Sequence, residues 1–168
     1  MIFQPSGIVT LTTDFGLRDP FVATMKGVIL TRCPSARIID LTHDIPAYGP
    51  GEAGFWLARA WQYFPSGTVH VAVVDPGVGT RRDIIAVAAQ AHVFLAPDNG
   101  LLAPVIAGLT QPQVIRLTPQ AMERAGIRAP SATFHGRDIF APLAAELAAG
   151  RRHPSDLGEP AAEYAPGW

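Results

Sequence analysis

The feature that most constrains the fold of this chain is the regular change in the spacing of its apolar residues, between the alternation typical of strands and the spacing typical of helices. Residues 7–14 alternate and are rich in β-branched side chains, which predicts a strand. Residues 20–31 place apolar side chains at helical spacing, and residues 37–42 return to a strand pattern. A helical stripe over 52–64 and an apolar run over 68–75 complete a strand–helix–strand–helix–strand order. This order predicts an α/β domain with a mainly parallel sheet and helices on both faces, in three layers α/β/α.

The second half of the chain predicts further elements of the same domain. Residues 83–90 and 92–96 have the pattern of two paired strands. A short helix over 101–109, a strand over 113–117 and an Ala- and Leu-rich helix over 140–149 follow. No internal repeat is visible.

The last eighteen residues differ in composition from the rest. Residues 151–168 contain three prolines, two glycines and no apolar period, which is typical of a linker or tail. A chain of 168 residues is long enough for one domain with a buried core. We therefore expect one domain over residues 1–150, followed by a linker or tail over 151–168.

Charge and cysteine content exclude several classes of function. The net charge of −1 argues against a non-specific nucleic-acid or membrane-surface partner. The single cysteine, Cys33, excludes a disulfide framework and a multi-cysteine metal site. No apolar run reaches the roughly 18 residues that a membrane span needs, and the N-terminus lacks a signal-peptide pattern. We expect a cytoplasmic protein.

Three acidic residues follow predicted strands. Asp14, Asp75 and Asp98 each stand at the end of a strand and directly before a turn sequence. Ligands in open α/β sheets bind outside the carboxyl ends of the strands. A single Asp in this position is more often a turn cap, but three on one edge favour a polar site.

Two loops carry the remaining candidate residues. The loop DPGVGTRR, residues 75–82, lacks the order of a P-loop and opens no dinucleotide-binding helix. Its tight turn places Asp75 within reach of Arg81 or Arg82, although a solvated ion pair is the simpler interpretation. His135, before the last helix, is a candidate for proton handling or anion contact. The scattered Asp and His residues offer no metal-ligand spacing, so no metal site is expected.

Five ordered motifs resemble one family, the S-adenosyl-L-methionine (SAM) hydroxide adenosyltransferases. These adenosine-forming SAM hydrolases are related to the fluorinases and chlorinases. The resemblance covers residues 8–150. Its motifs are LTTDFGLRDPFVATMKGVI (11–29), IIDLTHDIP (38–46), FPSGTVHVAVVDPGVGTRR (64–82), FLAPDNGLL (94–102) and, with Ala132 as an insertion, SATFHGRDIFAPLAA (131–145).

The resemblance implies a function and a set of site residues. It implies hydrolysis of SAM to adenosine and L-methionine by water attacking ribose C5′, with SAM as substrate and no separate cofactor. Asp75, Arg82 and His135 correspond to the catalytic residues around the water. Asp14 corresponds to the residue that binds the ribose hydroxyls, and Tyr48 to an aromatic beside the ribose.

The resemblance also leaves alternatives open. A related enzyme could use a halide and form a 5′-halo-adenosine, although halogenases replace the Asp75 position by tyrosine and lack the histidine. The family carries a C-terminal β-rich domain and assembles as a homotrimer, with sites between neighbouring subunits. Nothing in residues 151–168 corresponds to that domain. A non-catalytic nucleoside-binding or assembly module is therefore the third interpretation.

Overall fold

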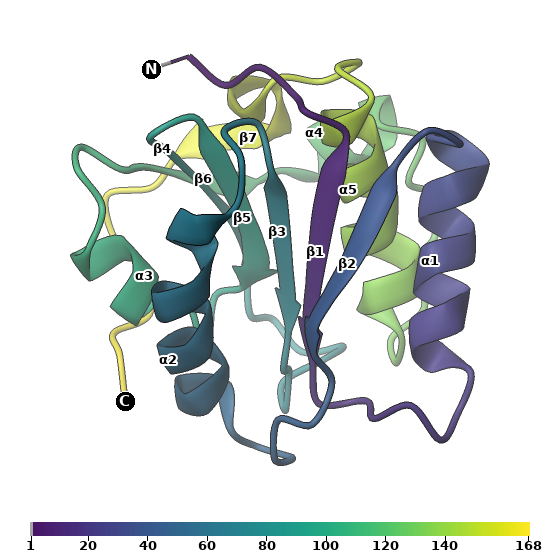
Figure 1. The fold of residues 1–168 in the computed structure, drawn as a ribbon, viewed down its shortest axis with the longest axis horizontal. Helices are drawn as coiled ribbons and strands as arrows, with labels where there is room; N and C mark the ends of the chain where they lie inside the picture. Colours follow the sequence, from purple (N-terminus) through teal and green to yellow (C-terminus); the bar gives the residue numbers. More distant parts are fainter. Residues whose placement is uncertain (1) are drawn as a thin grey trace.

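The six predicted strands and one further short strand form a seven-stranded sheet. A computed structural model of the chain describes residues 2–168. The strand order is β2-β1-β3-β5-β4-β6-β7 (Figure 1). The strands are β1 (Ile8–Thr13), β2 (Arg37–Thr42), β3 (Val69–Val73), β4 (Ile84–Ala89), β5 (His92–Pro97), β6 (Gln113–Leu117) and β7 (Gly158–Pro160).

The sheet is parallel where the sequence predicted strand–helix–strand units. β1 pairs in parallel with β2 and β3, and β3 pairs in parallel with β5. β4 is antiparallel to both β5 and β6, and β7 is antiparallel to β6. Only β4 and β7 therefore run against the other described strands. The prediction of a mainly parallel sheet is confirmed, and so is the pairing of β4 with β5.

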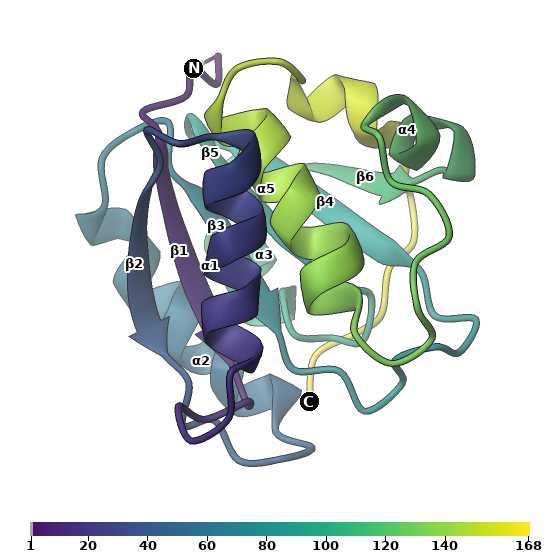
Figure 2. The same cartoon turned by 90° about the vertical axis from the view of Figure 1, so that its right-hand side faces the viewer.

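Helices cover both faces of the sheet, as the three-layer prediction requires. α1 and α5 lie together on one face, while α2 and α3 lie on the other (Figures 1 and 2). Each layer buries its own apolar cluster against the sheet. The helices are α1 (Phe21–Arg32), α2 (Pro50–Ala60), α3 (Ala103–Ala107), α4 (Pro119–Arg124) and α5 (Ala141–Ala148).

Two elements escaped the sequence analysis. α4 begins after Thr118, whose side chain accepts a hydrogen bond from the Ala121 backbone N–H. Residues 136–140 form a π-helical turn that continues into α5, so the last helical segment begins four residues earlier than predicted. This turn follows directly on His135, which acts as its N-cap residue.

Residues 151–168, predicted as a linker or tail, contain regular structure in their middle part. Residues 154–157 form a 3-10 turn, and β7 then adds to the sheet beside β6. Leu157 is buried in the main core, which anchors the segment. The prolines and glycines of this segment do not predict a strand, but β7 is a short edge strand, and proline is tolerated at the edge of a sheet. A domain boundary at residue 150 stays a prediction.

A buried histidine lies at the amino end of the sheet, away from the predicted site. His70 on β3 is fully buried, and its ring stacks on Phe94. Its Nδ1 lies 2.8 Å from the Thr10 hydroxyl, and its Nε2 lies 3.1 Å from Nδ1 of His92. Burial, and then the neighbouring His92, lower the pKa of His70 to about 3.

This histidine should make the fold sensitive to acid. Below pH 6.5 the unfolded chain protonates His70 while the native state does not, so stability falls as the pH drops toward 3. Between pH 7 and pH 5 the loss attributable to His70 should be roughly 2 kcal/mol. Urea unfolding at both pH values should show that His70→Gln removes most of this loss. An equal loss in the variant would contradict the assignment.

Candidate active site

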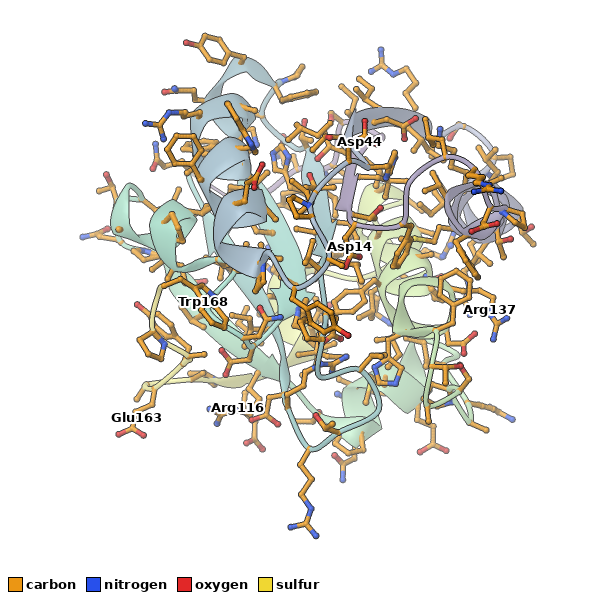
Figure 3. The ribbon with its side chains drawn as sticks, turned by 90° about the horizontal axis from the view of Figure 1, so that it is seen from below. Asp14, Asp44, Arg116, Arg137, Glu163 and Trp168 are labelled. Carbon is orange, nitrogen blue, oxygen red and sulfur yellow. The ribbon has the colours of Figure 1, made fainter. Side chains whose placement is uncertain are left out.

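Neighbouring parallel strands bring the predicted acidic residues to one edge of the sheet. Asp14 directly follows β1, Asp75 lies two residues after β3, and Asp98 directly follows β5. Because β1, β3 and β5 are adjacent and parallel, all three lie at the carboxyl edge. Figure 3 looks onto this edge, with Asp14 near the centre between Trp168 and Arg137. The predicted common location is confirmed.

Arg82, and not Arg81, pairs with Asp75. The Arg82 Nε lies 2.9 Å from Oδ2 and 3.1 Å from Oδ1 of Asp75, and its Nη2 also donates to Oδ2. The two side chains are only 4% (Asp75) and 11% (Arg82) exposed. The loop between them needs Gly79, which has φ +77°, because a Cβ there would clash with the Ala132 carbonyl oxygen. The loop therefore presses against the segment that carries His135.

His135 completes a row of three polar side chains. Its Nδ1 lies 2.7 Å from Nη2 of Arg82, so the guanidinium contacts both Asp75 and His135. The segment before it is fixed by Asp138, whose carboxylate accepts the Ser131 backbone N–H at 2.8 Å. Burial, and then the positive charge of Arg82, lower the pKa of His135. Since Nδ1 accepts from Arg82, the proton of the uncharged ring is on Nε2.

A cavity of about 340 Å³ opens beside these residues. Three phenylalanines form its apolar wall: the rings of Phe15, Phe21 and Phe134 meet edge to face, with centroid distances of 5.4 to 6.1 Å. Polar groups and an apolar aromatic wall thus face one space, which suits a ligand with both polar and apolar parts. The cavity is lined by Asp14, Phe15, Phe21, Val73, Asp75, Val78, Thr133, Phe134, His135 and Gly136.

Asp14 shares the cavity with Asp75. Burial, with a smaller contribution from the charge of Asp75, raises the pKa of the Asp14 carboxyl, against the opposing hydrogen bond from its own backbone. The cavity therefore holds two carboxyl groups in different settings. Asp75 is paired with a guanidinium, whereas Asp14 makes no ion pair among residues 2–168.

Two other candidate residues lie outside the cavity. Tyr48 is 79% exposed, has φ +64° and does not line the cavity. Asp98 accepts a hydrogen bond from the Ala165 backbone N–H, so it holds the C-terminal segment against the edge. The sequence grouped Asp98 with the other two acidic residues correctly by location, but its hydrogen bond is structural.

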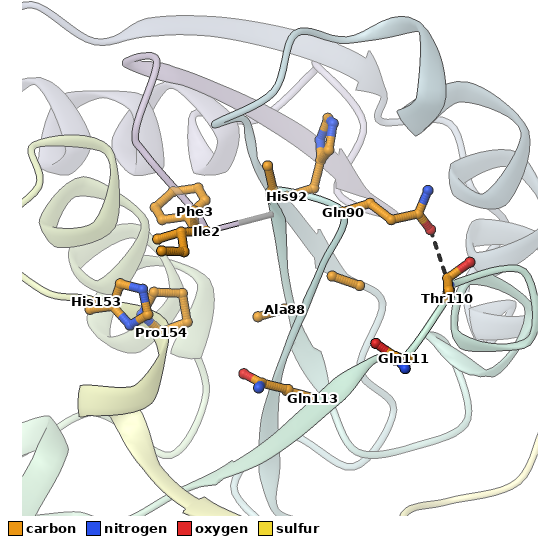
Figure 4. Close-up of a pocket in the computed structure, with 12 residues that line it drawn as sticks. Ile2, Phe3, Ala88, Gln90, His92, Thr110, Gln111, Gln113, His153 and Pro154 are labelled. Carbon is orange, nitrogen blue, oxygen red and sulfur yellow. Dashed lines mark hydrogen bonds between the residues drawn. The ribbon is translucent and has the colours of Figure 1, made fainter.

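A second depression, of about 310 Å³, lies at the opposite edge near the turn between β4 and β5 (Figure 4). Its lining includes Phe3, Gln90, Gln113 and His153, and the Gln90 Oε1 accepts the Thr110 backbone N–H at 3.1 Å. No Asp, Glu, Lys or Arg side chain is among its described lining residues. The cavity beside Asp75 is therefore the better candidate for chemistry.

Sequence reasoning missed the residues that support the site from behind. His43 is buried, and its ring lies within hydrogen-bond distance of Thr13 and Asp40. Asn99 donates from Nδ2 to the Val74 carbonyl at 2.9 Å, directly before Asp75. Both residues closely follow the ends of strands, and this location is the sequence feature from which a role near the site could have been predicted.

Residues 2–168 contain neither a metal-binding cluster nor a membrane-spanning helix. No cluster of three or more His, Cys, Asp or Glu side chains is arranged to hold a metal ion there. None of the helices in that range combines the length and the apolar character that crossing a membrane requires.

Comparison with known proteins gives consistent matches over most of the chain. The model of the SAM hydroxide adenosyltransferase N-terminal domain matches residues 9–158. The (R)-S-adenosyl-L-methionine hydrolase of Salinispora tropica is 44% identical over 163 residues, which cover 96% of this chain and 58% of that protein. The enzyme of the same name from Thermus thermophilus is 42% identical, covering 89% of this chain and 60% of its own length.

Solved structures and more distant relatives agree with this. The crystal structure of an uncharacterized conserved protein from Thermotoga maritima has a TM-score of 0.85 and 39% identity. That match covers 95% of this chain and 59% of the other. A fluorinase from an Actinoplanes species is 28% identical over 85% of this chain. The chain thus spans little more than half the length of the relatives it matches.

Replacing Arg82 should change the titration of His135. Arg82→Gln removes a positive charge and leaves the Asp75 carboxylate beside the imidazole, so the pKa of His135 should rise. Imidazole proton NMR across a pH series measures this. Arg81→Gln, at the exposed neighbouring arginine, is the matched control and should leave His135 unchanged. An unchanged His135 in Arg82→Gln would show that the contact is absent in solution.

Proposed function

Because this chain belongs to the SAM hydroxide adenosyltransferase family, we propose that it forms the water-activating part of a SAM hydrolase site. The proposed reaction converts SAM and water to adenosine and L-methionine. The hydrolases matched here are 39–44% identical to the chain, whereas the fluorinases are 26–28% identical. This difference supports water rather than a halide as the nucleophile.

The contact of Arg82 with both Asp75 and His135 is the observation that carries this proposal. The guanidinium fixes the carboxylate by two nitrogens, which sets the direction of its free lone pairs toward the cavity. One water bound there would be held in one orientation. Fixing a nucleophile against its target can lower a barrier by roughly 7–11 kcal/mol in the best cases.

The proposed step needs a base but no acid. The water oxygen bonds to ribose C5′ as the C5′–S bond breaks, and the electron pair of that bond stays on sulfur. The sulfonium becomes the neutral thioether of methionine, so the leaving group needs no proton. The proton lost by the water passes to the Asp75 carboxylate. The His135 ring, whose lowered pKa keeps it uncharged at neutral pH and whose proton is on Nε2, can donate a hydrogen bond that orients the water.

The proposed substrate-binding residues within the cavity are the lining residues other than Asp75 and His135. Asp14 would accept hydrogen bonds from the two ribose hydroxyls, and the three phenylalanines would line the apolar side. Tyr48 is proposed as an aromatic beside the ribose only through a movement of its exposed loop, because it does not line the cavity. SAM is the substrate, and no separate cofactor or metal is proposed.

The open side of the cavity suggests a protein partner. Leu17 is 70% exposed and Phe21 45%, both in the segment that follows β1 at the carboxyl edge. Trp168, at the same edge in Figure 3, is 83% exposed. Such apolar exposure favours burial by further protein. We propose a homotrimer in which a neighbouring subunit covers this edge and contributes the remaining adenine and methionine contacts. A cytoplasmic location is part of the same proposal.

Asp75→Asn should abolish most of the release of adenosine from SAM. The amide cannot take a proton from water, and loss of a general base typically costs about 10²–10⁴-fold in rate. Chromatography of adenosine and methionine measures the rate. Asp83→Asn, at a half-exposed carboxylate in the same loop region, is the matched control and should remain close to the wild-type rate.

Three results would contradict the proposal. Release of adenosine by Asp75→Asn at the wild-type rate would show that Asp75 is not the base. Formation of 5′-halo-adenosine in chloride or fluoride would favour the halide-using alternative. Binding of SAM or adenosine in titration calorimetry without any turnover would favour a non-catalytic nucleoside-binding module.

A further inference from the structure

A row of hydrogen-bonded side chains lies behind Asp14. The Thr13 hydroxyl lies 2.8 Å from Nδ1 of His43, and Nε2 of His43 lies 2.8 Å from Oδ1 of Asp40. The other Asp40 oxygen accepts from Nζ of Lys26 at 2.7 Å. The row thus links the end of β1, through β2 and the residue just after it, to the outer surface of α1.

The row ends at the turn that carries Asp14. The Phe15 backbone N–H donates to the Thr13 hydroxyl oxygen at 3.1 Å, so this bond spans Asp14. The next residue, Gly16, donates its backbone N–H to the His43 carbonyl at 2.8 Å. The backbone that follows Asp14 is therefore bonded to the Thr13 hydroxyl and to the His43 carbonyl, and the Thr13 hydroxyl in turn contacts the His43 ring.

Only one placement of the protons gives every polar hydrogen of the row an acceptor. The Asp40 carboxylate accepts, so His43 carries its ring proton on Nε2 and accepts at Nδ1. The Thr13 hydroxyl then donates to Nδ1, and its oxygen remains free to accept from Phe15. Although burial opposes it, hydrogen bonds from His43 and Lys26 lower the pKa of Asp40, which keeps it an acceptor.

We propose that Thr13, His43 and Asp40 are positioning residues that hold the Asp14 carboxyl in the cavity. This inference rests on the proposed function only in assigning Asp14 to the ribose hydroxyls. The row itself touches no cavity-lining atom except through the Asp14 turn, since none of its three residues lines the cavity. Its effect on a ligand must therefore pass through Asp14 or Phe15, the two cavity-lining residues of that turn.

The chain offers a matched control on the same strand. Thr12 and Thr13 are both fully buried on β1. The Thr12 hydroxyl has no hydrogen-bond partner among the described residues, whereas the Thr13 hydroxyl has two. Replacing either threonine by valine removes one hydroxyl at almost constant volume. Only Thr13→Val leaves the Phe15 N–H and His43 Nδ1 without partners.

The first measurement needs no ligand. Carbon-13 NMR titration of the Asp14 carboxyl should show a raised pKa in the wild type. In Thr13→Val the released turn exposes the carboxyl to water, so this pKa should fall toward its ordinary value. Thr13→Ser, which keeps the hydroxyl, and Thr12→Val should both retain the wild-type titration.

The second measurement separates binding from chemistry. Thr13→Val should weaken adenosine binding in calorimetry roughly tenfold, the order expected for one lost hydrogen bond. The rate at saturating SAM should change little, because Asp75, Arg82 and His135 are untouched. If Thr13→Val does not fold, Asp40→Ala removes the acceptor of the His43 Nε2–H at a position one-third exposed and should shift both readouts in the same direction.

Each outcome decides either this inference or the proposed function. An unchanged Asp14 titration in Thr13→Val and Asp40→Ala would overturn the positioning role, whatever the enzyme activity. An equal shift in Thr12→Val would do the same, since it would assign the effect to packing. A wild-type chain that neither binds adenosine nor consumes SAM would count against the proposed function, and the Asp14 titration would still decide the role of the row.

Discussion

The ion pair between Asp75 and Arg82 is the constraint on which the site depends. A carboxylate that is 4% exposed must be paired, because an isolated buried charge is costly. The pairing requires the loop 75–82 to fold back on itself, and that fold brings Gly79 against Ala132. The same guanidinium then reaches His135. One electrostatic requirement thus joins the end of β3, a loop and the turn before α5.

The sheet supplies the second half of the arrangement. β1 and β3 are adjacent and parallel, so Asp14 and Asp75 emerge side by side, and their surroundings then make them different. Arg82 binds Asp75, whereas Asp14 keeps a raised pKa and is held by the row through Thr13 and His43. The α1 side chain Lys26 closes that row on the outside. Each carboxyl group is therefore supported by a separate set of contacts, although the charge of Asp75 still contributes to the raised pKa of Asp14.

Periodicity and strand ends were sufficient to predict the α/β class, the parallel strands and the common location of Asp14 and Asp75. They could not choose between Arg81 and Arg82, because the direction of each side chain depends on the turn geometry of a glycine-containing loop. His43 escaped because its three partners come from β1, β2 and the adjoining backbone, which no local pattern reveals. β7 escaped because a three-residue edge strand has no measurable period. Tyr48 was assigned through resemblance alone, and its exposed location gives that assignment no geometric support.

In the proposed reaction, Asp75, Arg82 and His135 direct a water molecule to ribose C5′. Incubating the protein with SAM in oxygen-18-labelled water, followed by mass spectrometry of the products, tests it directly. Attack at C5′ places the label in the 5′-hydroxyl of adenosine and leaves methionine unlabelled. Adenosine without the label, or label in methionine, would contradict the account.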